Sequence, residues 1–296
     1  MIWSEMDTRT VTVNGLRVRY LEARPEVERD EPVLLIHGLG GWAENWAPVM
    51  PAIAASGRRA LALDLPGFGE SERARDPRYF DLEGGLYART FTGLLDALGL
   101  DRVHLAGQSF GGAVAFIAAI AAPERVRSLT LVAPGGIAPV LPPGFRFLVL
   151  PFIEHIGRVR STPRITREIL YTCFNDPSLC PEEVVAEAIR YQGASLAEMV
   201  RVLRSGVSFW RGIREDLRQA WLSRRDRYKG PVLIVWGRED RLLSSGLVGE
   251  IAALSERAEA HVIPSCGHLV MIERPQELMR LMLPFLERAS AVPVGE

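Results

Sequence analysis

Short apolar runs alternate with longer helical patterns along this chain, an order typical of a mostly parallel sheet with helices on both faces. The expected buried strands are 33–36, 60–64, 103–106, 129–132, 232–236 and 261–263. The expected helices between them are 46–56, 82–98, 110–121, 244–254 and 275–286. Alternating segments at 8–13 and 16–21 flank Asn14 and Gly15, a pair that favours a tight hairpin turn. The pattern therefore predicts an α/β fold that begins with a hairpin.

The alternation of strands and helices stops between Pro134 and Pro231. A crossover between parallel strands needs only about a dozen residues, so this stretch contains an insertion. Helical patterns lie inside it at 164–173, 181–191 and 196–210. We expect a core of residues 1–134 and 225–296, with a helical cap (lid) inserted at 135–224 over the carboxyl edge of the sheet.

The composition narrows the class of protein. The 296 residues are 48% hydrophobic and 24% charged, which fits a folded chain with a sizeable core. Lys and Arg together number 35 and Asp and Glu 36, so no basic field exists to hold a nucleic acid. The cysteines Cys173, Cys180 and Cys266 are too few and too irregularly spaced for a disulfide framework or a zinc site. No residue spacing implies a metal or an organic cofactor.

The N-terminal sequence MIWSEMDTRT lacks the basic start and apolar run of a signal peptide. The longest clean apolar run, 110–122, is shorter than the roughly 20 residues that cross a bilayer. We therefore expect a cytoplasmic protein without a transmembrane segment. The patterns leave open whether it forms a homodimer.

The segment Gly107-Gln108-Ser109-Phe110-Gly111-Gly112 directly follows an expected strand and begins an expected helix. A Gly-x-Ser-x-Gly match is common by chance. Here, however, the surrounding strand, sharp turn and helix form the arrangement that lifts a serine hydroxyl above the sheet edge. We predict that Ser109 is a nucleophile. The plainer alternative is a glycine-rich turn with an incidental serine.

A serine hydroxyl needs a base, and His268 is the best placed of the five histidines. It follows the last expected strand, at the carboxyl edge where a base for Ser109 should lie. Asp240 follows the neighbouring strand and can orient the imidazole, with Glu239 as its competitor. The alternative for His268 is a loop histidine that only packs. We interpret the other four histidines as structural: His37, His104, His155 and His261.

The loop His37-Gly38-Leu39-Gly40-Gly41 follows a buried strand and can turn the Leu39 amide toward the serine. With the amide of Phe110, it would supply the N–H donors that a tetrahedral oxyanion needs. The alternative is a dinucleotide or phosphate cradle, but the Gly-x-Gly-x-x-Gly spacing is absent. The turn at 64–71 is predicted to be structural, with Asp64 bonding its own loop.

The segments HGLGG, DLPGFGES, GQSFGG, WGRED and CGHLVMIERP occur in this order and resemble the α/β-hydrolase superfamily, in particular its lid-bearing members. The resemblance covers nearly the whole chain. It implies that Ser109 is the nucleophile, His268 the base and Asp240 its acid. It also implies an oxyanion hole formed by the amides of Leu39 and Phe110, and a cap within the insertion.

Subfamilies of the superfamily differ at these motifs. Epoxide hydrolases and haloalkane dehalogenases carry aspartate at the nucleophile position, so Ser109 disfavours their chemistry. The chain is also similar to the meta-cleavage product hydrolases, which cleave C–C bonds and share the serine turn and the WGRxD segment. Their loop usually reads HGxGPG and an aromatic residue commonly follows their histidine, whereas this chain has Gly41 and Leu269.

We expect a carboxylesterase-type serine hydrolase that cleaves small-molecule esters of a mostly apolar acyl group through an acyl-enzyme. The residues expected to line its pocket are Phe145, Phe147, Phe152, Trp210 and Leu269. The plainer alternative is that these side chains only seat the cap on the core. Two other functions stay open: C–C hydrolysis of a meta-cleavage-type diketone, and ligand binding by a non-catalytic receptor of the same fold.

Overall fold

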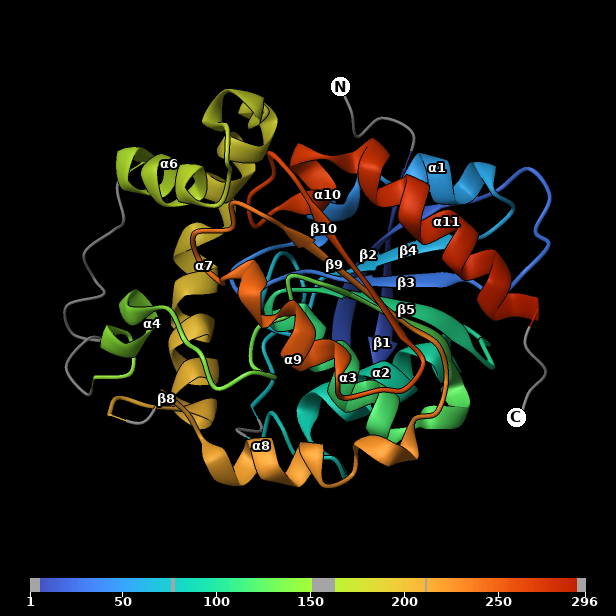
Figure 1. Cartoon of the computed structure of the whole chain (residues 1–296), viewed down its shortest axis with the longest axis horizontal. Coiled ribbons are helices and arrows are strands. Elements are labelled where there is room, and N and C mark those ends of the chain that lie inside the picture. The colour runs from blue at the N-terminus through green and yellow to red at the C-terminus, as the bar shows by residue number, and fades with distance from the viewer. Residues whose placement is uncertain (1–5, 76–77, 151–162, 211, 292–296) are drawn as a thin grey trace.

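The computed structural model describes residues 6–75, 78–150, 163–210 and 212–291. An eight-stranded sheet runs through its centre in the order β1-β2-β4-β3-β5-β6-β9-β10 (Figure 1). β1 (Asp7–Val13) and β2 (Leu16–Ala23) form the predicted hairpin, and β2 pairs antiparallel with β4 (Ala60–Leu63). All other neighbours are parallel. The predicted mostly parallel α/β sheet is confirmed.

The strands β3, β4 and β9 are apolar and buried along their whole length because helices cover both faces of the sheet. The bounds of the remaining strands are β3 (Val33–Ile36), β5 (Val103–Gln108), β6 (Val126–Val132), β9 (Val232–Gly237) and β10 (Ala258–Ile263). Side chains alternate between two cores: Leu34 and Ile36 of β3 enter one, and Val33 and Leu35 enter the other. The carboxyl ends of these strands therefore meet at one edge, held rigidly from both sides.

Each face of the sheet has its own helices (Figure 1). The first core contains side chains of α2 (Leu86–Ala97), α3 (Phe110–Ala121) and α9 (Val248–Ala252). The second contains side chains of α1 (Met50–Ala55), α10 (Val270–Glu273) and α11 (Pro275–Ala291). Short 3-10 turns lie at η1 (Ala43–Trp46), η2 (Pro123–Arg125), η4 (Arg225–Arg227) and η5 (Ser245–Leu247). Within the described part of the chain, no helix combines the length and apolarity that a membrane span requires.

We call residues 135–224, which lie between β6 and β9, the insertion. Its elements are α4 (Pro143–Phe147), α6 (Pro163–Thr172), η3 (Pro177–Leu179), α7 (Glu182–Gly206), β7 (Val207–Ser208), β8 (Gly212–Ile213) and α8 (Glu215–Leu222). In Figure 1, α7 runs along the left side of the molecule, with α6 above it and α4 outside it. That the insertion is a separate cap domain stays a prediction.

The prediction of two separate helices at 181–191 and 196–210 is wrong. The structure has one continuous helix, α7, and a short hairpin of β7 and β8 follows it. A glycine inside a helix lowers the stability of the helix by only about 1 kcal/mol relative to alanine. The buried face of α7, which includes Val184, Val185, Tyr191 and Val202, more than offsets that cost.

Candidate active site

Ser109 lies at the turn between β5 and α3, with φ 52° and ψ −121°. This backbone conformation is strained for any residue that has a Cβ. Hydrogen bonds hold it in place. The Ser109 amide donates to the Val132 carbonyl at 2.9 Å, and the Ser109 carbonyl accepts from the amides of Gly112 and Gly135 at 2.8 and 2.9 Å. Ser109 itself stays partly exposed at the end of the strand.

The glycines of the motif permit close packing around this turn. A Cβ on Gly107 would collide with the carbonyl of Gly111, and one on Gly111 would collide with the carbonyls of Ile36 and His37. β3, β5 and α3 therefore meet at a distance that only glycine allows.

His268 and Asp240 come from neighbouring loops at the same edge of the sheet. His268 Nδ1 lies 2.7 Å from Asp240 Oδ2, and both side chains are buried. Oδ2 also accepts from Trp236 Nε1 at 3.1 Å, and Oδ1 accepts from the amides of Leu242 and Leu243 at 2.9 Å each. Because its partner is a carboxylate, Nδ1 carries the proton and Nε2 is left as the basic nitrogen.

The neighbouring acid, Glu239, faces away from the imidazole. Its Oε2 accepts from the Cys266 amide at 3.0 Å, and its own amide donates to the Cys266 carbonyl at 3.0 Å. Glu239 therefore braces the histidine loop, while Asp240 contacts the imidazole.

The glycine-rich loop after β3 packs directly against the serine turn. A Cβ on Gly38 would meet Gln108 Oε1 and would lie 3.2 Å from Ser109 Cβ. The Gly41 amide donates to the Gly38 carbonyl at 3.0 Å, and Gly40 has φ +75°. This tight turn therefore lies directly beside Ser109.

Phe110 begins α3, and an amide in the first turn of a helix has no acceptor within the helix. The Phe110 ring packs edge-on against Tyr87 and Phe80, with centroid distances of 5.5 and 6.1 Å. This packing fixes the start of α3 and keeps the Phe110 amide next to the serine. Ser109, at the end of β5, and the bonded His268–Asp240 pair, after β10 and β9, thus lie at the same carboxyl edge of the sheet. These are the residue types that nucleophilic acyl chemistry uses.

A family model described as the alpha/beta hydrolase fold matches residues 31–275. This chain is an α/β hydrolase. Its relatives include the 2-hydroxy-6-oxo-6-phenylhexa-2,4-dienoate hydrolase of Burkholderia cepacia, 32% identical over 86% of this chain and 87% of that protein. Another is the dihydrolipoyllysine-residue acetyltransferase component of the acetoin cleaving system of Pseudomonas putida, 32% identical over 93% of this chain and 68% of that protein.

Among solved structures, a membrane phospholipase A, described as a novel bacterial virulence factor, is similar to this α/β hydrolase with a TM-score of 0.76. The two chains are 27% identical, and the match covers 97% of this chain and 88% of that one.

Gln108 is a site residue of the α/β hydrolase that sequence reasoning missed. Its side chain is buried, and Nε2 donates to the carbonyl of His268 at 3.2 Å. Its Oε1 lies against Gly38. Gln108 therefore touches the serine turn, the glycine loop and the histidine loop at once. The available signal was its position, directly before the serine in the motif.

Two of the other histidines are buried and structural. The Leu65 amide donates to His37 Nε2 at 3.0 Å, and His37 Nδ1 bonds the Gly38 carbonyl at 2.7 Å. Burial lowers the pKa of His37 to about 4 and that of His104 to about 3, so both are neutral near pH 7. His261 lies in β10, and His155 lies outside the described residues.

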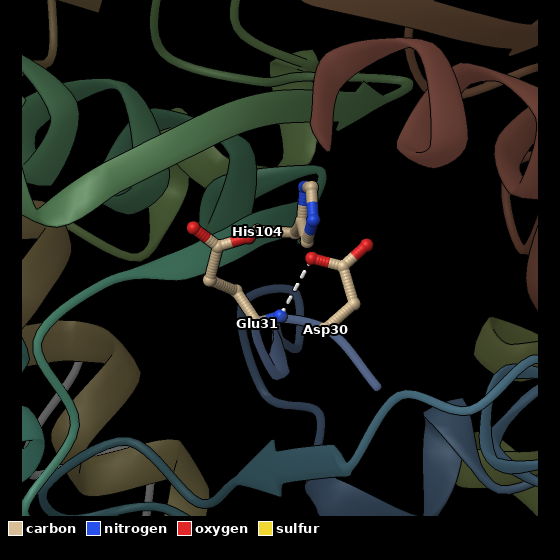
Figure 2. Close-up of side chains that lie close together, drawn as sticks. All are labelled: Asp30, Glu31 and His104. Atoms are coloured by element: carbon tan, nitrogen blue, oxygen red, sulfur yellow. Dashed lines mark hydrogen bonds between the residues drawn. The ribbon is translucent and has the colours of Figure 1, made fainter. Parts of the chain in front are cut away.

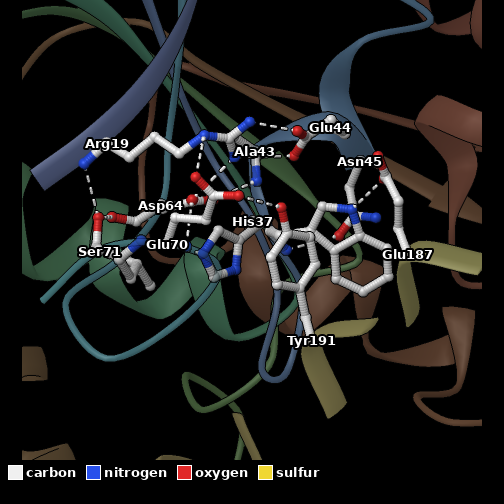
Figure 3. A network of polar contacts seen from close by, with 12 residues as sticks. Arg19, His37, Ala43, Glu44, Asn45, Asp64, Glu70, Ser71, Glu187 and Tyr191 are labelled. Atoms are coloured by element: carbon white, nitrogen blue, oxygen red, sulfur yellow. Dashed lines mark hydrogen bonds and ion pairs between the residues drawn. The ribbon is translucent and has the colours of Figure 1, made fainter. Parts of the chain in front are cut away.

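Figure 3 shows a polar network next to the glycine loop. Asp64 accepts from the amides of Ala43 and Glu70 at 2.7 and 2.9 Å and from Arg19 Nη1 at 3.0 Å. Arg19 also pairs with Glu44. Asp64 bonds its own loop, as predicted, and its charge is matched by a buried arginine.

One cluster in the described part of the chain has the residue types of a metal site. Ligand atoms of Asp30, Glu31 and His104 lie within 4.8 Å of one another (Figure 2). However, Arg58 pairs with Asp30 and Arg127 with Glu31, both at 2.6 Å. Because arginines already neutralise both carboxylates, the cluster fits a structural ion-pair group rather than a cation site.

Two of the aromatic side chains expected to line the pocket face solvent instead. Phe147 is 57% exposed and Trp210 85% exposed. The Phe209 ring packs edge-on against each of them, with centroid distances of 6.0 and 4.9 Å, at the outer surface of the insertion. Phe145 is partly exposed in α4, and Phe152 lies outside the described residues.

Other apolar side chains do reach the loops of the site. A Cβ on Gly40 would lie 2.8 Å from Met199 Sδ, and one on Gly135 would lie 3.2 Å from Leu243 Cδ1. Leu269, which sequence reasoning did name, is buried directly after His268. Met199 and Leu243 carried no distinctive signal, because α7 and the loop after β9 are brought here only by the fold.

The insertion also contacts the glycine loop through a titratable group. Trp42 Nε1 donates to Glu187 Oε2 at 2.7 Å, and the Trp42 ring packs against Tyr191 (5.6 Å between centroids). Figure 3 shows Glu187 and Tyr191 on this side of the network. Burial, together with the negative charge of Glu44, raises the pKa of Glu187 to about 7.

A carboxyl group whose pKa is higher in the folded than in the unfolded protein stabilises the folded state fully only when the pH is below the unfolded pKa. This stabilisation is lost as the pH rises through the folded-state pKa. Glu187→Gln keeps the acceptor for Trp42 but cannot ionise. We expect nearly equal Tm values for the variant and the wild type at pH 4, below the unfolded pKa of a glutamate. At pH 8 the variant should melt about 1–4 °C higher, since the group is partly exposed and the effect is screened.

Thermal unfolding followed by circular dichroism at both pH values checks this. Glu183→Gln, an exposed position one turn earlier on α7, is the matched control and should show no such difference. A wild type that is the more stable protein at pH 8 would contradict the prediction.

Proposed function

We propose that this α/β hydrolase is a serine carboxylesterase acting on esters of mostly apolar acyl groups. The observation that carries the proposal is the combination at one sheet edge of Ser109, held at φ 52°, with the 2.7 Å bond between His268 and Asp240. A strained serine above a sheet and an oriented base are what an acyl-enzyme mechanism requires.

In the proposed mechanism, Ser109 Oγ attacks the ester carbonyl carbon while His268 Nε2 takes its proton. Asp240 keeps Nδ1 protonated and stabilises the imidazolium. The amides of Leu39 and Phe110 donate to the oxyanion of the tetrahedral intermediate. His268 then protonates the departing alcohol, and the same nitrogen deprotonates a water molecule that hydrolyses the acyl-enzyme.

The preference for an apolar acyl group is supported by the side chains that reach the site. Met199 and Leu243 are apolar and lie against the loops beside Ser109. The buried Arg19 near the glycine loop is already paired with Glu44 and Asp64, so it offers no free charge to an anionic substrate. We propose that the insertion acts as the lid of this pocket.

A second candidate is C–C bond hydrolysis, which the 32% identity to the dienoate hydrolase of Burkholderia cepacia favours. The same serine, histidine and aspartate would serve that reaction. A dienoate substrate carries a carboxylate, which needs a counter-charge in the pocket.

Steady-state kinetics can separate the two candidates. The purified protein is assayed with p-nitrophenyl esters of increasing acyl length and with 2-hydroxy-6-oxo-6-phenylhexa-2,4-dienoate. We expect kcat for the best ester within about 1–1000 per second and a kcat/KM at least about tenfold above that for the dienoate. The opposite order would favour the C–C hydrolase. Failure of a fluorophosphonate to label Ser109, read by mass spectrometry, would contradict both.

A further inference from the structure

A buried carboxylate joins the insertion to the loop of the proposed catalytic base. Glu273, at the end of α10, is 5% exposed. Its Oε2 accepts from the amide of Gly267 at 2.6 Å and from that of Asn175 at 3.1 Å. Its Oε1 accepts from the amide of Asp176 at 2.9 Å. One side chain thus binds the residue before His268 and two consecutive residues of the insertion.

The backbones of the two segments also contact each other directly. The His268 amide donates to the Cys173 carbonyl at 2.7 Å. Gly267 has no room for a side chain, because a Cβ there would lie 2.5 Å from the Cys173 carbonyl oxygen and 2.6 Å from the Asn175 nitrogen. The position of the His268 backbone is therefore set from outside its own loop, by residues between α6 and α7.

This junction is part of a core and not a surface contact. Phe174, which lies between the bonded residues, is fully buried, and it shares a cluster with Leu269, Val270 and Val185. Burying a carboxylate is costly unless donors surround it, and backbone amides of both segments supply those donors here. A buried polar network whose donors and acceptors are satisfied is rigid.

We propose that Glu273 is a positioning residue that couples the 173–176 segment of the insertion to the imidazole of His268. It touches neither the substrate nor the reacting atoms. By clamping both segments it keeps Nε2 in line with Ser109, and it transmits any shift of the insertion to the base. This inference extends the proposed function, because it gives the insertion a part in placing the base as well as in forming the pocket.

Glu273→Gln tests the proposal with almost no change in volume. The glutamine side chain has one acceptor oxygen where glutamate has two. Its NH2 group would therefore face at least one of the three backbone N–H groups and weaken the link between the two segments. A displacement of about 1 Å can cost about 100-fold in rate. We expect kcat for the best p-nitrophenyl ester, and the rate of Ser109 labelling by a fluorophosphonate, to fall about 10- to 100-fold. KM should stay within about threefold, because the pocket is untouched.

The matched control is Glu287→Gln, an exposed position on α11, which should label at the wild-type rate. All rates are taken well below the Tm of each protein, so that a loss of stability alone does not lower them. A wild type that fails to label would overturn the proposed nucleophile and this inference with it. A wild type that labels, with a folded Glu273→Gln variant that labels equally fast, would overturn the positioning role alone.

Should the variant fail to fold, hydrogen exchange on the wild type decides. The clamp requires the amides of Gly267, Asn175 and Asp176 to be protected to a similar degree, as one cooperative unit. Much faster exchange at Asn175 and Asp176 than at Gly267 would show that the insertion moves independently of the histidine loop, and would overturn the proposal.

Discussion

Replacing Ser109 with alanine is expected to lower kcat for ester hydrolysis by about a million-fold while the protein stays folded. The reason is that the hydroxyl supplies the atom to which the acyl group is transferred, and removal of a serine nucleophile costs about this much in hydrolases with such a triad. Steady-state assays with p-nitrophenyl esters, with circular dichroism to confirm folding, measure both results.

The backbone at Ser109 adds a second expectation that a generic serine does not carry. At φ 52° a Cβ is strained, whereas glycine is not. Ser109→Gly should therefore be as inactive as Ser109→Ala but more stable than it, by about 1 kcal/mol or about 2–4 °C in Tm. Retained ester turnover in either variant would mean that Ser109 is not the nucleophile. An alanine variant at least as stable as the glycine variant would mean that the turn is unstrained.

Replacing Asp240 with asparagine is expected to lower kcat by about 10,000-fold. Oδ2 accepts from both His268 Nδ1 and Trp236 Nε1, and Oδ1 accepts from two backbone amides. An asparagine must direct its NH2 group at donors on one side or the other. If it faces Nδ1, the imidazole adopts the wrong tautomer and Nε2 is no longer a base.

Glu239→Gln is the informative comparison for Asp240, because the sequence alone left Glu239 as a competitor for the same role. The Glu239 side chain accepts from the Cys266 amide and not from the imidazole, so its replacement should cost no more than about tenfold in kcat. Equal losses in the two variants, measured by kcat at several pH values, would mean that the orienting acid has been misassigned.

The strand, serine turn and helix around Ser109 were predictable because they are encoded locally. Val103–Gln108 is apolar enough to be a buried strand, and the glycines that follow allow the close approach that the turn needs. α3 spans the predicted 110–121. The loops carrying Asp240 and His268 were predictable for a related reason, since the carboxyl ends of parallel strands must share one edge.

Contacts between distant segments could not be predicted from such local features of the sequence. Glu239 and Asp240 are adjacent in sequence, and only the packing of β9 against β10 decides which carboxylate reaches the imidazole. Sequence reasoning assigned Gln108 no role, and only the fold brought the glycine and histidine loops to its side chain. Trp210 looked like a pocket residue because it is aromatic, although its ring faces solvent.

The sequence by itself determined the order of strands and helices, the hairpin at the start, and the placement of Ser109, Asp240 and His268 at one edge of the sheet. Those features depend on apolar periodicity and on glycine-bearing turns, which act over a few residues. Only the tertiary structure decided that α7 is continuous, that Trp42 binds Glu187, and that Glu273 joins the insertion to the histidine loop. The last two depend on polar groups from segments 145 and 98 residues apart, and no local pattern records which donor will meet which acceptor.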